Sequence, residues 1–173
     1  MRDDDFWTLI DGSLARSGHD GYPTGAHLAI LLSELERLPL RDVVAFEDLQ
    51  VQHLNELMTW RHIGAAEHYC GEGLTSDPLE YFLAWSLHLG REQHQRFVED
   101  PDSLADLPSA ESDVALGEEL LLAPHTAYRR RTNKVLSAEH GITMLVRLPE
   151  GDPAERHNPA QMLPRLWALK LQM

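Results

Sequence analysis

The chain has 173 residues, of which 43% are hydrophobic and 25% are charged. This length and composition are typical of one soluble globular domain with its own core, and they exclude a disordered protein. Twenty-eight acidic residues against fifteen basic ones give a formal net charge of −13. The field of such a protein repels phosphate backbones and anionic lipid, so we expect neither a nucleic acid nor a membrane as partner.

The single cysteine, Cys70, excludes an intramolecular disulfide and is typical of a reducing compartment. The first residues, Met1 to Asp5, are acidic where a signal peptide would be basic. No apolar run approaches the ~18 residues that a membrane span requires. These features predict a cytoplasmic protein.

The N-terminal part of the chain repeats apolar residues at helical spacing. Asp5 is expected to cap a first helix that ends at Gly18, and a loop should follow over residues 19–22. A second helix should run from Pro23 to Pro39 and lie antiparallel to the first. The next pattern, 41–60, has a broad apolar face, which predicts a long helix in a central position.

Helical spacing resumes over residues 63–69, after which two glycines favour a helix end. Ser76 or Asp77 before a proline is a strong start signal, and the helix that follows has so little polar surface that it should be buried. A short helix carrying Phe97 comes next. Residues 109–133 should form the last helix of the main body, bent or split at Pro124.

The C-terminal part has a different pattern, because residues 142–148 are strand-like or form extended chain packed on the helices. A final amphipathic helix is predicted over 160–171. The fold class is therefore mainly α, a compact multi-helix bundle with a short extended segment near the C-terminus. We expect a single domain over 1–173, with a main bundle over 1–133 and a tail over 134–173 that packs back on it.

Ten histidines raise the question of a metal site. The densest group of ligand types is His62, Glu67, His68 and Cys70. Adjacent residues diverge on a helix, whereas paired helical ligands lie three or four positions apart, so the spacing predicts no metal and no cofactor. His53 and His88 lie among apolar residues, and hydrogen-bonded core histidines explain them better than catalytic bases do.

Polar and aromatic side chains gather between residues 60 and 85, around a glycine-rich turn. Aromatic walls with a few polar groups form small-molecule pockets and interface hot spots. The alternative is that Trp60 and Trp85 simply fill the core where two helices cross. The candidate binding residues, none of them predicted to be catalytic, are Trp60, His62, Glu67, Asp77, Tyr81 and Trp85.

Several ordered stretches resemble the bacterial protein family of unknown function DUF4240. They are Asp4 to Asp11, Val44 to Phe46, Trp60 to Ala65, Ser76-Asp77, Tyr81-Phe82 with Trp85, Gly90 to Glu92, Asp100 to Ala105 and Leu163 to Ala168. The resemblance implies a small helical domain, usually alone on its chain, without an established activity. Pro78-Leu79 and Leu83 depart from the family's pattern of a glycine after an acidic pair and a later arginine. If those residues form the family's working site, this chain has lost half of it.

Catalytic signatures such as Gly-x-Ser-x-Gly or a phosphate-binding glycine loop are absent from the sequence. We therefore expect a non-catalytic interaction or regulatory protein that binds a partner protein, as immunity proteins do, and the acidic charge favours a basic partner. The alternative is a small-molecule binder or an enzyme that uses the 60–85 region, with His62 or Glu67 as acid or base. The arginines at 129–131 favour a solvated helix end over a nucleic-acid site. The oligomeric state is not predicted.

Overall fold

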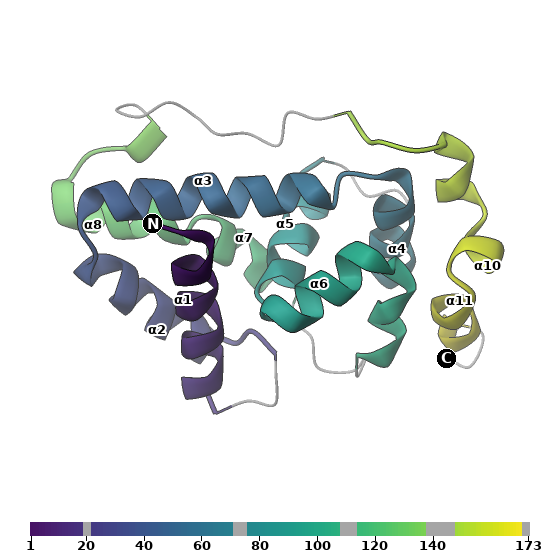
Figure 1. The fold of residues 1–173 in the computed structure, drawn as a ribbon, viewed down its shortest axis with the longest axis horizontal. Coiled ribbons are helices and arrows are strands. Elements are labelled where there is room, and N and C mark those ends of the chain that lie inside the picture. Colours follow the sequence, from purple (N-terminus) through teal and green to yellow (C-terminus); the bar gives the residue numbers. More distant parts are fainter. Residues whose placement is uncertain (19–21, 71–75, 108–113, 138–147, 171–173) are drawn as a thin grey trace.

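The computed structural model of the chain describes residues 1–18, 22–70, 76–107, 114–137 and 148–170, and most of them are helical (Figure 1). The helices are α1 (Asp3–Arg16), α2 (Gly25–Arg37), α3 (Leu40–Glu56), α4 (Trp60–Cys70), α5 (Ser76–Leu87), α6 (Arg91–Glu99), η1 (Pro101–Asp106), α7 (Leu116–Leu121), α8 (Ala123–Thr132), η2 (Pro153–His157), α10 (Pro159–Met162) and α11 (Pro164–Lys170). The predicted mainly α bundle is confirmed. No helix within these ranges is both long and apolar enough to cross a membrane.

The first helix begins at Asp3, so the predicted capping position of Asp5 is wrong. Arg2 occupies the N-cap, and Asp5 stands three residues later as the acidic member of a capping box. Its carboxylate accepts a hydrogen bond from the backbone N–H of Arg2 at 3.0 Å and others from the Arg2 guanidinium. Carboxylates in a first turn also complement the helix dipole, which explains why this start is favoured.

The predicted long helix over 41–60 ends early, at Glu56, and α4 starts at Trp60. The backbone between them pairs with a distant segment. Glu150 donates its N–H to the carbonyl of Met58 at 2.9 Å, and the N–H of Trp60 donates to the carbonyl of Glu150 at 3.0 Å. This pairing satisfies backbone groups that a continuous helix would have satisfied itself, so the break depends on a tertiary contact.

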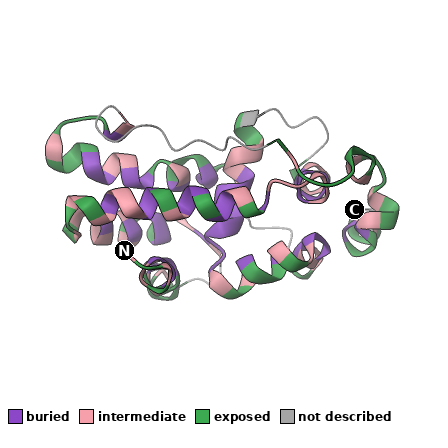
Figure 2. Cartoon of the chain, turned by 45° about the horizontal axis from the view of Figure 1, so that its top comes forward, coloured by how far each residue is buried: buried purple, intermediate pink, exposed green. Residues whose placement is uncertain are grey.

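The centre of the bundle is α5, as its apolar sequence predicts. Every residue from 82 to 90 is buried, and α5 packs against α3, α4, α6 and α7. Figure 2 shows the buried faces of the longer helices turned toward this centre. On the far side of α7, Leu122 separates that helix from α8, and Pro124 lies in the first turn of α8. The predicted split near Pro124 is therefore confirmed.

The arginine run at 129–131 and the strand-like segment at 142–148 are two further predictions from the sequence. The arginine run closes α8, where Arg130 pairs with Glu36 at 2.9 Å and Arg131 donates to the carbonyl of Leu38. The arginine run therefore stands at a helix end, as predicted. The strand-like segment predicted at 142–148 lies outside the described residues except at Leu148, which is exposed.

The predicted final helix over 160–171 is broken in two, because Leu163 separates α10 from α11 and Pro164 opens the second helix. Residues 148–170, which we call the docked tail, lie beside α4 and η1, at the opposite end of the molecule from α8 (Figure 1). Leu163 and Leu166 are buried and join the main core. The predicted packing of the C-terminal helix against the bundle is thus seen for these residues.

The contact between α5 and α7 requires a glycine. A methyl group added at Gly117 would overlap the backbone carbonyl of Tyr81, whereas one added at Gly12 in α1 would meet nothing within 4 Å. We predict that Gly117→Ala lowers the free energy of unfolding by about 3 kcal/mol or more, because backbone atoms must separate. Gly12→Ala should raise it by about 0.5–1 kcal/mol through helix propensity. Urea unfolding of both variants measures the difference, and equal stabilities would contradict the proposed close approach.

Candidate functional site

The six candidate residues lie on two neighbouring helices, three on α4 and three on α5. They do not share one environment. Trp85 is 0% exposed, and its ring lies against those of Tyr69, at 5.6 Å between centroids, and Phe82, at 5.8 Å. Trp85 therefore fills the core, as the alternative interpretation of the sequence holds. Trp60 is only partly buried and lies at the surface end of α4.

The first turns of α5 carry the other two residues of that helix. Asp77 is exposed and Tyr81 is partly buried. Desolvation raises the pKa of Tyr81, and the negative charges of Glu118 and Asp77 add to this effect. This end of α5 is an acidic edge beside α7, and its phenol remains protonated at neutral pH.

The buried side chain of His62 connects α4 to α6. Its Nε2 lies 2.9 Å from the carbonyl oxygen of Phe97, which only accepts, so Nε2 carries the proton and donates. Its Nδ1 then accepts from the hydroxyl of Thr59 at 2.8 Å. Burial lowers the pKa of His62 to about 4. With both nitrogens engaged and the ring neutral, His62 has a structural role here.

Trp60 and Glu67 come together around an arginine of the docked tail. The guanidinium of Arg156 donates two hydrogen bonds to the Glu67 carboxylate, from Nε at 2.8 Å and from Nη2. Its Cζ atom also lies 5.8 Å from the centroid of the Trp60 ring. The Glu67 side chain is only 12% exposed and that of Arg156 28%, so solvent screens this ion pair less than it would screen a surface pair. A bidentate carboxylate beside an aromatic face is a site for a guanidinium.

The backbone of the tail approaches α4 closely at the same place. A Cβ atom on Gly64 would lie 3.4 Å from the Cα of Arg156. We call Trp60 and Glu67, with the Arg156 guanidinium between them, the arginine site. Gly64 lies on α4 between Trp60 and Glu67, and its lack of a side chain lets the tail approach α4 closely there. Sequence analysis missed this role of Gly64 because a glycine inside a helix shows no partner by itself.

Further contacts hold the rest of the tail through acidic residues. The buried carboxylate of Asp102 accepts from the backbone N–H groups of Arg165 and Leu166, both at 2.9 Å, and so caps the start of α11. Asp106 pairs with the Arg165 guanidinium, and the His68 ring donates to the carbonyl of Leu166 at 2.9 Å. We call the surface formed by Trp60, Glu67 and His68 of α4 together with Asp102 and Asp106 of the adjoining η1 the α4 face.

The residues considered as metal ligands from the sequence have other contacts in the structure. His62, Glu67 and His68 are all in the hydrogen bonds described above, and Cys70 is an exposed free thiol. A different set gathers elsewhere, where ligand atoms of His53, Glu56 and His94 lie within 4.8 Å of one another. The sequence contained one signal for it, the i, i+3 spacing of His53 and Glu56, but His94 is on a separate helix.

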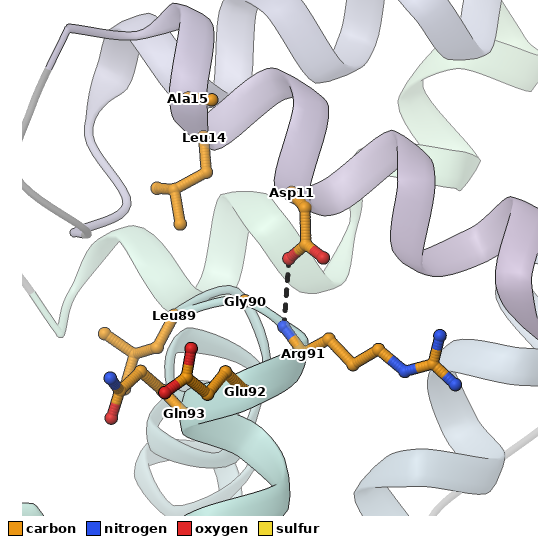
Figure 3. Close-up of a pocket in the computed structure, with 8 residues that line it drawn as sticks. All are labelled: Asp11, Leu14, Ala15, Leu89, Gly90, Arg91, Glu92 and Gln93. Carbon is orange, nitrogen blue, oxygen red and sulfur yellow. Dashed lines mark hydrogen bonds between the residues drawn. The ribbon is translucent and has the colours of Figure 1, made fainter.

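A shallow hollow of about 340 Å³ lies between α1 and the start of α6 (Figure 3). Its polar groups are largely engaged. Asp11 accepts from the backbone N–H of Arg91 at 2.9 Å and thus caps α6, and the Arg91 guanidinium pairs with Asp4 at 2.8 Å. Gly90 precedes α6 with a φ of 95°, a conformation that glycine adopts without strain. This arrangement positions α6, and we assign the hollow no binding role.

The fold and the α4 face define a small helical domain with an acidic surface that contacts its own C-terminal tail. The chain belongs to the family described as Protein of unknown function (DUF4240), whose model matches residues 1–130. The family resemblance noted from the sequence is thereby confirmed. Comparison with curated proteins and with solved structures gave no match. Glu67 and the other acidic members of the α4 face lie within the matched residues, and the docked tail lies beyond them.

Buried histidines predict a pH dependence of stability. Burial lowers the pKa of His27 and of His62 to about 4, and it also lowers the pKa of His88 well below its usual value. The unfolded chain binds protons near pH 6.5 and the folded chain does not. The contribution of these neutral rings to the free energy of unfolding is therefore complete above pH 6.5, and it falls as the pH drops from 6.5 toward 4.

We predict that unfolding in urea at pH 5 shows a loss of roughly 2 kcal/mol for each of His27 and His62 relative to pH 7.5, since one pKa unit is worth about 1.4 kcal/mol. The variant His62→Gln should be less stable overall but should have a shallower dependence on pH. A stability that is flat between pH 7.5 and 5 would show that these rings accept protons in the folded state.

Proposed function

We propose that the chain is a non-catalytic interaction protein whose α4 face binds an arginine-bearing segment of a basic partner protein. The observation that carries this proposal is the arginine site, in which Glu67 and Trp60 hold the guanidinium of Arg156. The docked tail occupies this surface within the chain itself. It is a model for the chemistry of the partner segment, which competes with the tail for the same groups.

The chemistry of the face favours arginine over lysine. Two parallel N–H groups match the two oxygens of Glu67, and a planar guanidinium lies well on the Trp60 ring. An ammonium group makes only a point contact with a carboxylate and is more strongly hydrated. The face therefore discriminates by shape as well as by charge.

The whole protein adds a long-range contribution. Its net charge of −13 attracts a basic partner and accelerates association at low salt. The tail is attached to the face, so its effective concentration is high. A partner thus needs several contacts along the face, and the acceptors Asp102 and Asp106 supply the next ones beyond Glu67.

The test uses a chain ending at residue 147 and a labelled peptide that spans residues 148–173, with fluorescence anisotropy as the readout. We predict 1:1 binding, and a loss of at least tenfold when the peptide carries Arg156→Ala or the protein carries Glu67→Gln, because each change leaves a charged group unpaired. Glu119→Gln, an exposed carboxylate on α7, is the matched control and should leave the affinity unchanged.

Competition then tests the partner chemistry. An arginine decapeptide should displace the labelled peptide at a concentration at least tenfold lower than a lysine decapeptide of the same charge. Equal displacement by the two peptides would mean that net charge alone attracts them, and the proposal would be wrong. Should the shortened chain fail to fold by circular dichroism, hydrogen exchange of residues 150–167 in the full chain, with and without each decapeptide, gives the same comparison.

A further inference from the structure

We propose that His53, Glu56 and His94 form a binding site for a divalent transition-metal ion, with zinc as the probe that fits its ligands. The site lies where α1, α3 and α6 meet and shares no residue with the α4 face. The proposal is therefore independent of the proposed partner binding. Two imidazoles and one carboxylate are the ligand types of an open, three-ligand zinc site.

The distances match a shared ion. The Nδ1 of His53 lies 3.2 Å from Oε2 of Glu56, and the Nε2 of His94 lies 3.6 Å from the same oxygen. Ligand atoms about 2.0–2.1 Å from a tetrahedral zinc ion are about 3.3 Å from one another. Two of the three ligand pairs thus lie near the spacing that coordination needs, and all three ligand atoms lie within 4.8 Å of one another.

His94 gives an independent reason to expect a ligand. It is 1% exposed, and within the described part of the chain neither of its ring nitrogens has a hydrogen-bond partner. A buried imidazole with one nitrogen unpaired and the other 3.6 Å from a carboxylate, beyond ordinary hydrogen-bond length, is incompletely satisfied. An ion bound between His94 and Glu56 would satisfy Nε2, which already faces that carboxylate.

The surroundings of His53 are those of a metal ligand. Oδ1 of Asp3 lies 2.7 Å from Nε2 of His53, so the carboxylate accepts the proton on that nitrogen. Nδ1 makes a hydrogen-bond contact with Glu56 at 3.2 Å, and a bound ion would replace that contact by taking the lone pair of Nδ1. Arg91 approaches the other oxygen of Asp3 at 3.5 Å and fixes it. A carboxylate behind a histidine is the usual outer contact of zinc-bound imidazole, which it orients and makes more basic.

The cluster of His53, Glu56 and His94 is bordered by the Trp7 ring and reaches solvent at Glu56. The Trp7 ring packs against both imidazoles, with its centroid 4.9 Å from that of His53 and 5.2 Å from that of His94. On the opposite side the Glu56 side chain is 42% exposed. An ion held here keeps at least one coordination position toward solvent, where water or an anionic ligand binds. Trp7 also provides an optical probe beside the ion.

The experiment titrates the full chain, free of any affinity tag, with Co²⁺ and then with Zn²⁺. We expect one Co²⁺ per chain with the intense visible bands of four- or five-coordinate cobalt, and their loss when Zn²⁺ displaces it. Zn²⁺ at 100 times its Kd should raise the melting temperature by about 5–10 °C. Cu²⁺ should quench the emission of Trp7, so Trp7→Phe should show less quenching than the native chain.

Variants separate coordination from a structural role. Glu56→Gln keeps the shape of an exposed side chain and should lower Zn²⁺ affinity at least tenfold, and Asp3→Asn should lower it about 10- to 100-fold through the outer contact. Glu92→Gln, an exposed carboxylate on the same helix as His94, should change nothing. Equal Zn²⁺ affinity of Glu56→Gln and the native chain would overturn the proposal. So would the absence of binding by the native chain at Zn²⁺ concentrations up to about 100 μM. His94→Gln disturbs the core, so its Zn²⁺ affinity is measured only after its folding has been verified. An affinity equal to that of the native chain would also overturn the proposal.

Discussion

The structure depends on the complete burial of α5. Residues 82–90 have no exposed side, so this helix is stable only when α3, α4, α6 and α7 all cover it. That requirement fixes where α4 and α6 lie. The arginine site is on the outer side of α4, and His94 comes from α6. Both candidate sites are thus positioned by packing that has no functional chemistry of its own.

The buried histidines of this protein divide into two kinds. His62 is paired through both ring nitrogens, and His27 and His88 share one hydrogen bond of 3.1 Å in the core. These neutral rings link helices, and they make folding sensitive to acid. His94 differs, because its Nε2 lies 3.6 Å from the Glu56 carboxylate and within reach of the same ion as a ring nitrogen of His53. Nδ1 of His27 and Nε2 of His88 also lack a hydrogen-bond partner, so it is the convergence of His94 with Glu56 and His53 that points to a ligand.

The acidic character of the chain acts at two ranges. Over long distances the net charge favours basic partners and disfavours nucleic acid. At contact distance three acidic residues of the body, Glu67, Asp102 and Asp106, hold the docked tail by its arginines and its helix start. A surface that already accommodates an arginine-bearing segment of its own chain is suited to another such segment. This physical fit supports the interaction role more strongly than the sequence did.

The sequence by itself determined the mainly α class, the buried α5, the break near Pro124 and the burial of His53 and His88, because each follows from local periodicity or from a single residue's backbone preference. Trp60 and Glu67 were also found from their residue types, although their partner was not. Only the tertiary structure decided that α3 ends at Glu56, that Arg156 fills the arginine site, and that His94 joins His53. Glu67 and Arg156 are 89 positions apart, and contacts across such separations leave no periodic trace in a sequence. They form only when the burial of apolar faces brings the helices together.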